Sequence, residues 1–162
     1  MRRWLVRGAL GGFFLLCALQ LVPYGWWHDN PPVVQDAPWP DQATADLARG
    51  ACYDCHSNET EWPLYSYVAP MSWLVRRDVE GGRDELNFSE WGEDGDEAHD
   101  AAEEVEDGSM PPSQYQLLHP DARLSDAEVA QLVAALEAMD EGDRGGDDDN
   151  SGPGNAEDRD ED

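Results

Sequence analysis

The sequence CYDCH, residues 52–56, is the feature that most restricts this chain, because it places two cysteines and a histidine within five consecutive positions. The chain has three cysteines in 162 residues, so two of them lie in this motif. A CxxC pair is used in three chemistries: a redox disulfide, a zinc site and the covalent attachment of haem. The residue that follows the pair distinguishes between them.

His56 favours haem attachment. In c-type attachment each cysteine sulfur adds to one haem vinyl group, and the histidine that follows binds the iron. A thioredoxin-like pair needs no such histidine and normally follows a strand, whereas no strand pattern precedes Cys52. A zinc site needs four ligands. Outside the motif the candidate histidines are His28, His99 and His119. We therefore predict one covalent haem c, attached to Cys52 and Cys55 with His56 as proximal ligand; a redox disulfide and a zinc site remain the alternatives.

The second axial position of the iron needs its own ligand, and Met110 is the first candidate. It lies in EDGSMPPSQY, where two prolines stiffen the loop and reduce the entropy lost on ordering the thioether. A His/Met pair raises the reduction potential and suits electron transfer. His119, in LLHPD, is the runner-up, either as a ligand or as a partner of a haem propionate.

Residues 62–75, WPLYSYVAPMSWLV, form an aromatic stretch that we expect to line the cofactor pocket. Aromatic side chains supply large apolar area, and tyrosine and tryptophan add a polar tip. The predicted wall residues are Trp62, Tyr65, Tyr67 and Trp73. Ordinary core packing is the alternative interpretation for the same residues.

An apolar run follows three arginines at the N-terminus, in MRRWLVRGALGGFFLLCALQLV. We predict a transmembrane anchor over residues 4–23 in contact with membrane lipid, after a cytoplasmic segment 1–3, because arginines before a span stay in the cytoplasm. The rest of the chain would then lie on the periplasmic side of the cytoplasmic membrane. A cleaved signal peptide is the alternative.

The remaining chain is expected to be an all-α, cytochrome c-like haem domain over residues 42–140, behind a proline-rich extended stalk over residues 24–41. A helix from about Gln42 should run into Cys52. A second helix, from about Pro70 to Val79, should end at the pair Gly81 and Gly82.

The last predicted helix lies in LSDAEVAQLVAALEAMD. Ser125 and Glu128 form a capping box, and apolar residues follow at helical spacing. We expect this helix to pack against the helix that precedes the motif.

Acidic residues dominate the charge: 36 aspartates and glutamates against 10 arginines give a formal net charge of −26. The acidic stretch 90–107 and the tail 141–162 are expected to be solvated or disordered, because self-repelling segments bury little apolar surface. The excess also argues against a nucleic-acid partner, since phosphate binding needs clustered basic side chains. His28, in the stalk, and His99, in the acidic stretch, are expected to be solvated.

The blocks CYDCHSNETEWPLYSYVAPMSWLVRRDVEGGRDELNFSEW and GSMPPSQYQLLHPDARLS resemble the small bacterial haem-binding domain family of membrane-anchored c-type cytochromes. The likeness covers roughly residues 30–139. It implies one covalent haem c held by Cys52, Cys55 and His56, and by analogy with cytochromes c it places Met110 on the distal side. The acidic insert and tail depart from the family pattern.

The hypothesis from the sequence is a membrane-anchored monohaem cytochrome that carries single electrons between redox partner proteins and is not an enzyme. The alternative is a haem-based sensor or peroxidase-like enzyme with an open sixth iron site.

Overall fold

The structure, a computed structural model, describes residues 1–94 and 97–147, and within those ranges it contains helices and one isolated bridge between Gln35 and Glu90 but no strand. The predicted all-α class is confirmed. The elements are α1 (Arg2–Leu19), α2 (Gln42–Ala51), α3 (Tyr53–His56), η1 (Leu64–Tyr67), α4 (Met71–Glu85), α5 (Trp91–Asp94), α6 (Ala98–Glu106), α7 (Ser113–Leu118), η3 (Pro120–Ala122) and α8 (Asp126–Asp147).

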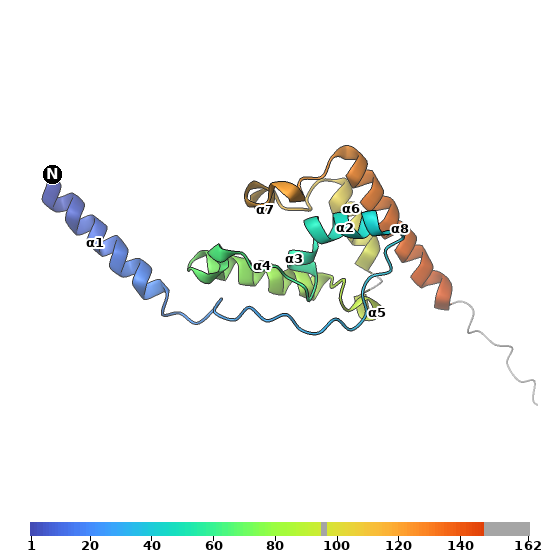
Figure 1. The fold of residues 1–162 in the computed structure, drawn as a ribbon, viewed down its shortest axis with the longest axis horizontal. Coiled ribbons are helices and arrows are strands. Elements are labelled where there is room, and N and C mark those ends of the chain that lie inside the picture. The colour runs from blue at the N-terminus through green and yellow to red at the C-terminus, as the bar shows by residue number, and fades with distance from the viewer. Residues whose placement is uncertain (95–96, 148–162) are drawn as a thin grey trace, which may run out of the picture.

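The core lies where α2, α6 and α8 meet. Helix α6 packs along α8, and α2 lies against the same helix (Figure 1). Their buried apolar side chains form one cluster with the segment that follows α4; its members include Ala48, Phe88, Trp91, Ala102, Val105, Leu132 and Leu136. Gln131 on α8 also donates from Nε2 to Thr44 Oγ1 of α2 at 2.8 Å. The predicted packing of the last helix against the helix before the motif is confirmed.

Both predicted helix starts are confirmed. At α2, the Asp41 side chain accepts from Thr44 N at 2.9 Å. At α8, Ser125 N donates to Glu128 Oε2 at 2.7 Å and Glu128 N donates to Ser125 Oγ at 3.4 Å, which is the reciprocal pattern of a capping box. Helix α8 continues to Asp147, past the predicted boundary at residue 140. The rest of the predicted tail, residues 148–162, lies outside the described residues.

Helix α4 does not end before Gly81, and the prediction that the glycine pair stops it is wrong. The helix runs through both glycines to Glu85. A Cβ at Gly82 would lie 2.6 Å from the carbonyl oxygen of Cys55, so the missing side chain lets α4 approach the backbone of α3. The glycine therefore serves close packing of two helices.

The acidic stretch also differs from its prediction, because residues 98–106 form α6. Ala98, Ala102 and Val105 are buried at positions i, i+4 and i+7, and the carboxylates occupy the remaining faces. This short apolar stripe is enough to dock the helix against α8. His99, which was expected to be solvated, is half-exposed and lies 3.5 Å from Glu103 on the same helix.

Residues 20–37, which we call the strap, run beneath α4 as an extended segment (Figure 1). Val34 N and Gln35 N both donate to the carbonyl oxygen of Ser89, at 2.9 and 3.0 Å, and Ala37 N donates to Phe88 O at 2.8 Å. The predicted stalk is thus hydrogen-bonded to the domain along this part of its length.

The other end of the strap is fastened as well. The side-chain amide of Gln20 donates to Ala69 O at 3.1 Å and accepts from Ala69 N at 3.0 Å, as a neighbouring backbone would. His28 was expected to be solvated, but its Nε2 lies 3.0 Å from Ser66 O and its ring stacks on Tyr67 at 4.0 Å. The strap is a packed part of the domain.

Helix α1 stands away from the rest of the chain, and none of its residues is buried (Figure 1). It ends at Leu19 and includes Arg2, Arg3 and Arg7, so it is shorter and more charged than the predicted anchor over residues 4–23. Across residues 1–94 and 97–147, no helix has the length and apolar character needed to cross a bilayer. The predicted spanning helix is not found.

The packing of α4 on α3 predicts opposite effects for two glycines. Gly82→Ala should lower the free energy of unfolding by about 1–3 kcal/mol, because the new Cβ meets the Cys55 backbone. Gly50→Ala should raise it by about 0.5–1 kcal/mol, because that helical position has open space around it. Urea denaturation followed by circular dichroism measures both, and equal effects would contradict the close approach.

Candidate functional site

The three motif residues Cys52, Cys55 and His56 line one cavity of about 670 Å³. Its walls come from α4, α6 and α7, and Tyr65 of η1 and Leu132 and Leu136 of α8 also line it. The lining is mostly apolar. Binding sites for small molecules and cofactors usually enclose about 300–1,000 Å³, so the size suits a cofactor.

His56 is held by its side chain and its backbone. Its Nδ1 lies 3.1 Å from the carbonyl oxygen of Leu86, which can only accept, so Nδ1 carries the proton. Its carbonyl oxygen accepts from Phe88 N at 2.8 Å. Burial lowers the pKa of His56, although the hydrogen bond to Leu86 opposes that shift. The imidazole is therefore neutral, and Nε2 keeps a lone pair.

Cys52 and Cys55 are free thiols. Burial raises the pKa of both to about 12, with a smaller contribution from Cys55 at Cys52 and from Asp54 at Cys55. At neutral pH both sulfurs therefore stay protonated and are poor nucleophiles until something activates them.

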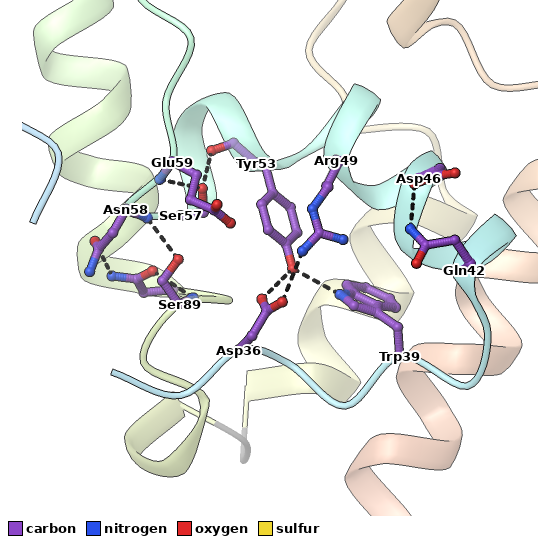
Figure 2. Close-up of polar contacts among 11 residues, drawn as sticks. Asp36, Trp39, Gln42, Asp46, Arg49, Tyr53, Ser57, Asn58, Glu59 and Ser89 are labelled. Carbon is purple, nitrogen blue, oxygen red and sulfur yellow. Dashed lines mark hydrogen bonds and ion pairs between the residues drawn. The ribbon is translucent and has the colours of Figure 1, made fainter. Parts of the chain in front are cut away.

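Tyr53, the first residue between the cysteines, anchors the motif from below (Figure 2). Its hydroxyl donates to Asp36 Oδ1 at 2.7 Å and accepts from Trp39 Nε1 at 2.9 Å. Its ring stacks on Phe88 at 5.4 Å, and the guanidinium of Arg49 lies 4.9 Å above it. Burial raises the pKa of Tyr53, so the hydroxyl remains a donor. No role was predicted for Tyr53 from the sequence.

The end of α3 is fixed by a second group of polar contacts (Figure 2). Ser57 Oγ donates to the carbonyl oxygen of Tyr53 at 2.7 Å and accepts from Glu59 N at 2.9 Å. Asn58 N donates to Ser89 Oγ at 3.0 Å. These bonds turn the chain directly after His56, so that α3 ends with the imidazole at the cavity.

Both candidate distal residues line the cavity. Met110 is 36 % exposed, follows Gly108 at φ +80°, and its amide donates to Glu104 O at 2.9 Å. His119 lies at the end of α7 with its Nε2 2.6 Å from the hydroxyl of Tyr65. The two side chains reach the same cavity from different parts of one segment.

The predicted aromatic wall is only partly at the cavity. Tyr65 lines it, but Trp62, Tyr67 and Trp73 are not among the lining residues. Trp62 and Tyr67 instead flank His28 of the strap, with ring centroids 4.6 and 4.0 Å away. The sequence pattern of residues 62–75 does not reveal which of these side chains line the cavity, because η1 has only four residues and cannot show a helical repeat.

Asp54 and Tyr115 also line the cavity, although no role was predicted for them from the sequence. Tyr115 Oη donates to Asp54 Oδ2 at 2.8 Å, which joins α7 to the CxxCH helix. The available signals were a polar residue between the two cysteines and a tyrosine three residues after the Pro111–Pro112 pair.

Comparison with known protein families assigns most of the chain to one domain family. The model of the haem-binding domain matches residues 14–138. This chain belongs to the haem-binding domain family. No curated protein and no solved structure matches it significantly. The coarse prediction of a haem-binding protein is thereby confirmed, and the cavity at the CxxCH motif is the haem site to test.

The residues of the haem domain fit such a group. The cavity offers two free thiols and one imidazole lone pair, and Gly81 and Gly82 leave part of its α4 wall without side chains. Arg77 is the lining residue suited to a propionate, whereas Arg76 pairs with Glu80 at 2.6 Å. Over residues 1–94 and 97–147, no group of three or more His, Cys, Asp or Glu side chains is arranged to hold a metal ion, as the zinc alternative would need.

The raised thiol pKa values predict slow alkylation of the haem-free, folded chain. Since the thiolate is the nucleophile, a pKa of about 12 instead of 9 lowers the reactive fraction near pH 8 about a thousandfold. The rate at both cysteines should rise about tenfold per pH unit up to pH 11. Iodoacetamide labelling followed by mass spectrometry measures this, with the exposed Cys17 as the internal control. Equal rates at all three cysteines would contradict a formed cavity.

Proposed function

We propose that the haem-binding domain carries one haem c, attached through thioethers to Cys52 and Cys55, and moves single electrons between redox partner proteins. The observation that carries the proposal is the shared cavity of two free thiols and the Nε2 lone pair of His56. A haem c supplies an iron that cycles between the ferric and ferrous states, one electron at a time. Attachment adds each S–H across a vinyl group, so no leaving group is formed.

His56 acts as the proximal ligand in this proposal. Its Nδ1–H donates to Leu86 O, which fixes the ring orientation and raises the basicity of Nε2, as the outer partners of ligating histidines do. Burial keeps the imidazole neutral, and only the neutral form offers a lone pair to iron. The residue therefore needs no proton loss when the cofactor arrives.

Met110 is the preferred distal ligand. Nε2 of His119 is engaged by the Tyr65 hydroxyl at 2.6 Å, and burial raises the pKa of Tyr65, so this hydroxyl stays protonated and can donate. Met110 offers its thioether from a loop that is fixed on both sides, by the Glu104 carbonyl before it and by the buried Pro111 after it. A His/Met iron has the raised potential that suits a carrier.

The second candidate function is a haem-based sensor or peroxidase-like enzyme with an open sixth site. The observation in its favour is the Tyr65–His119 pair at the cavity, which resembles a proton-donating couple beside a vacant coordination position. In that case Met110 would not bind the iron.

The ligand assignment predicts different results for two methionines of the cavity. Met110→Ala should leave the haem attached, lower the reduction potential, and convert the ferrous iron to a form that binds CO at least about tenfold faster, because a strong axial ligand is lost. Met71→Ala, the matched control at the same cavity, should leave all three unchanged. Optical redox titration and stopped-flow CO binding measure the difference. A wild-type chain that already binds CO as fast as Met110→Ala would instead favour the sensor or enzyme.

We also propose that α1 contacts membrane lipid and holds the haem domain outside the cytoplasmic membrane. Its apolar side chains are exposed, including Phe13 at 61 % and Phe14 at 68 %. Arginines lie at its start, where they can meet anionic headgroups. Export fits the chemistry of the site, since c-type attachment to a CxxCH motif is expected in an extracytoplasmic compartment.

Lipid contact through α1 is tested by adding charge to its apolar surface. The double variant Phe13→Glu, Phe14→Glu should lower the fraction of full-length chain bound to vesicles of phosphatidylcholine and phosphatidylglycerol at least about tenfold, because it removes two exposed rings that would be buried in the lipid. Leu64→Glu, at a residue 90 % exposed on the haem domain, is the control and should not change binding. Co-sedimentation gives the bound fraction. Unchanged binding of the double variant would rule out this contact.

A further inference from the structure

The segment that carries both distal candidates has little apolar support. Helix α7 has six residues, all of them described, and none is buried; Leu117 and Leu118 are 72 % and 53 % exposed. The position of α7 over the cavity must therefore depend on polar contacts. Tyr115 is its one aromatic residue, and it faces the cavity.

Tyr115 makes one contact to another element and one contact within its own segment, because His119 is the C-cap residue of α7. Its hydroxyl donates to Asp54 Oδ2 at 2.8 Å, and its ring stacks on His119 at 4.2 Å with an interplanar angle of 13°. His119 in turn meets the hydroxyl of Tyr65 at 2.6 Å. The chain Asp54–Tyr115–His119–Tyr65 thus connects the CxxCH helix to α7 and then to η1.

The segment from Met110 to Gln116 is cross-linked by its own hydrogen bonds, so that a contact that fixes Tyr115 also restrains Met110. Gln116 Nε2 donates to Pro111 O at 2.6 Å, and Tyr115 N donates to Pro112 O at 2.9 Å. Pro111 is itself buried. The loop after Met110 and the first turn of α7 therefore form one unit.

We propose that Asp54 and Tyr115 are positioning residues for the distal side of the haem: their hydrogen bond holds α7, and with it the thioether of Met110, over the cavity. The proposal rests on the proposed function, because it concerns how the distal ligand is kept in place. Asp54 lies between the two cysteines that would hold the haem. The bond to Tyr115 therefore ties α7 directly to the motif that would attach the porphyrin.

The electrostatics of the bond favour its persistence. Burial, followed by the bond to Asp54, raises the pKa of Tyr115, so the phenol remains a donor across the physiological range. The acceptor is held too, because Asp54 Oδ1 accepts from Glu61 N at 2.9 Å. A phenol donating to a fixed carboxylate is a charge-assisted hydrogen bond, which is stronger than a neutral one.

The test is Tyr115→Phe in the full chain with haem attached, which removes the hydroxyl and retains the ring that stacks on His119. Ferrous CO association should become about ten to a hundred times faster, because the loss of one hydrogen bond to a charged group raises the population with Met110 displaced by that factor. The matched control is Tyr67→Phe, whose ring packs on His28 in the strap and not at the cavity. It should bind CO at the wild-type rate.

Two substitutions of the acceptor Asp54, and one double variant, extend the test. Asp54→Ala should reproduce the effect of Tyr115→Phe, and Asp54→Asn, which retains an acceptor oxygen, should have a smaller effect. The double variant Tyr115→Phe, Asp54→Ala should bind CO no faster than Asp54→Ala alone, because each substitution removes the bond between Tyr115 and Asp54. Multiplied effects in the double variant would overturn the proposal.

The outcomes separate this proposal from the proposed function. If Met110→Ala speeds CO binding and Tyr115→Phe does not, Met110 is the ligand and the positioning role is wrong. If Met110→Ala also has no effect, the ligand assignment fails and the positioning role fails with it. Haem content, measured by pyridine haemochrome, should be unchanged in every variant, and loss of haem from Tyr115→Phe would assign the bond to folding of the site instead.

Discussion

The hydrogen bond between His56 Nδ1 and the carbonyl oxygen of Leu86 is the constraint on which the site depends. Leu86 directly follows α4, so the imidazole can be oriented only if α4 lies close to α3. That approach requires Gly82, where a side chain would meet the backbone of Cys55. A glycine in a helix interior normally costs stability, and here it permits the close packing of α4 on α3 that orients the imidazole of His56.

The motif is supported on both sides by the residues between its cysteines. Tyr53 donates to Asp36 of the strap and packs on Phe88 of the core, whereas Asp54 accepts from Tyr115 of α7. One short helix therefore connects the core, the strap and the distal segment. A four-residue helix has almost no stability of its own, so these contacts must fix its orientation.

Sequence patterns predicted the features that depend on local chemistry. Each of these features is encoded by residues close together in the sequence: the capping box of Ser125, the helix from Gln42 and the CxxCH motif. The structure has the capping box and the helix where they were expected. The features that were missed depend on partners distant in sequence. The passage of α4 through Gly82 is decided by Cys55, and the burial of α6 is decided by α8, so charge and glycine content alone gave the wrong answer. Of the four predicted aromatic wall residues only Tyr65 lines the cavity, and two of the others, Trp62 and Tyr67, pack against His28 of the strap, which is distant in sequence.

The strap has a mechanical consequence for the haem domain. Gln20 pairs with Ala69 immediately after α1 ends at Leu19, so no loose residue separates that helix from its first attachment point. A flexible linker would let the haem domain reorient relative to α1. The strap instead fixes the orientation of the cavity relative to α1. Under the proposed function, a redox partner would meet a cavity whose orientation relative to α1 is already set.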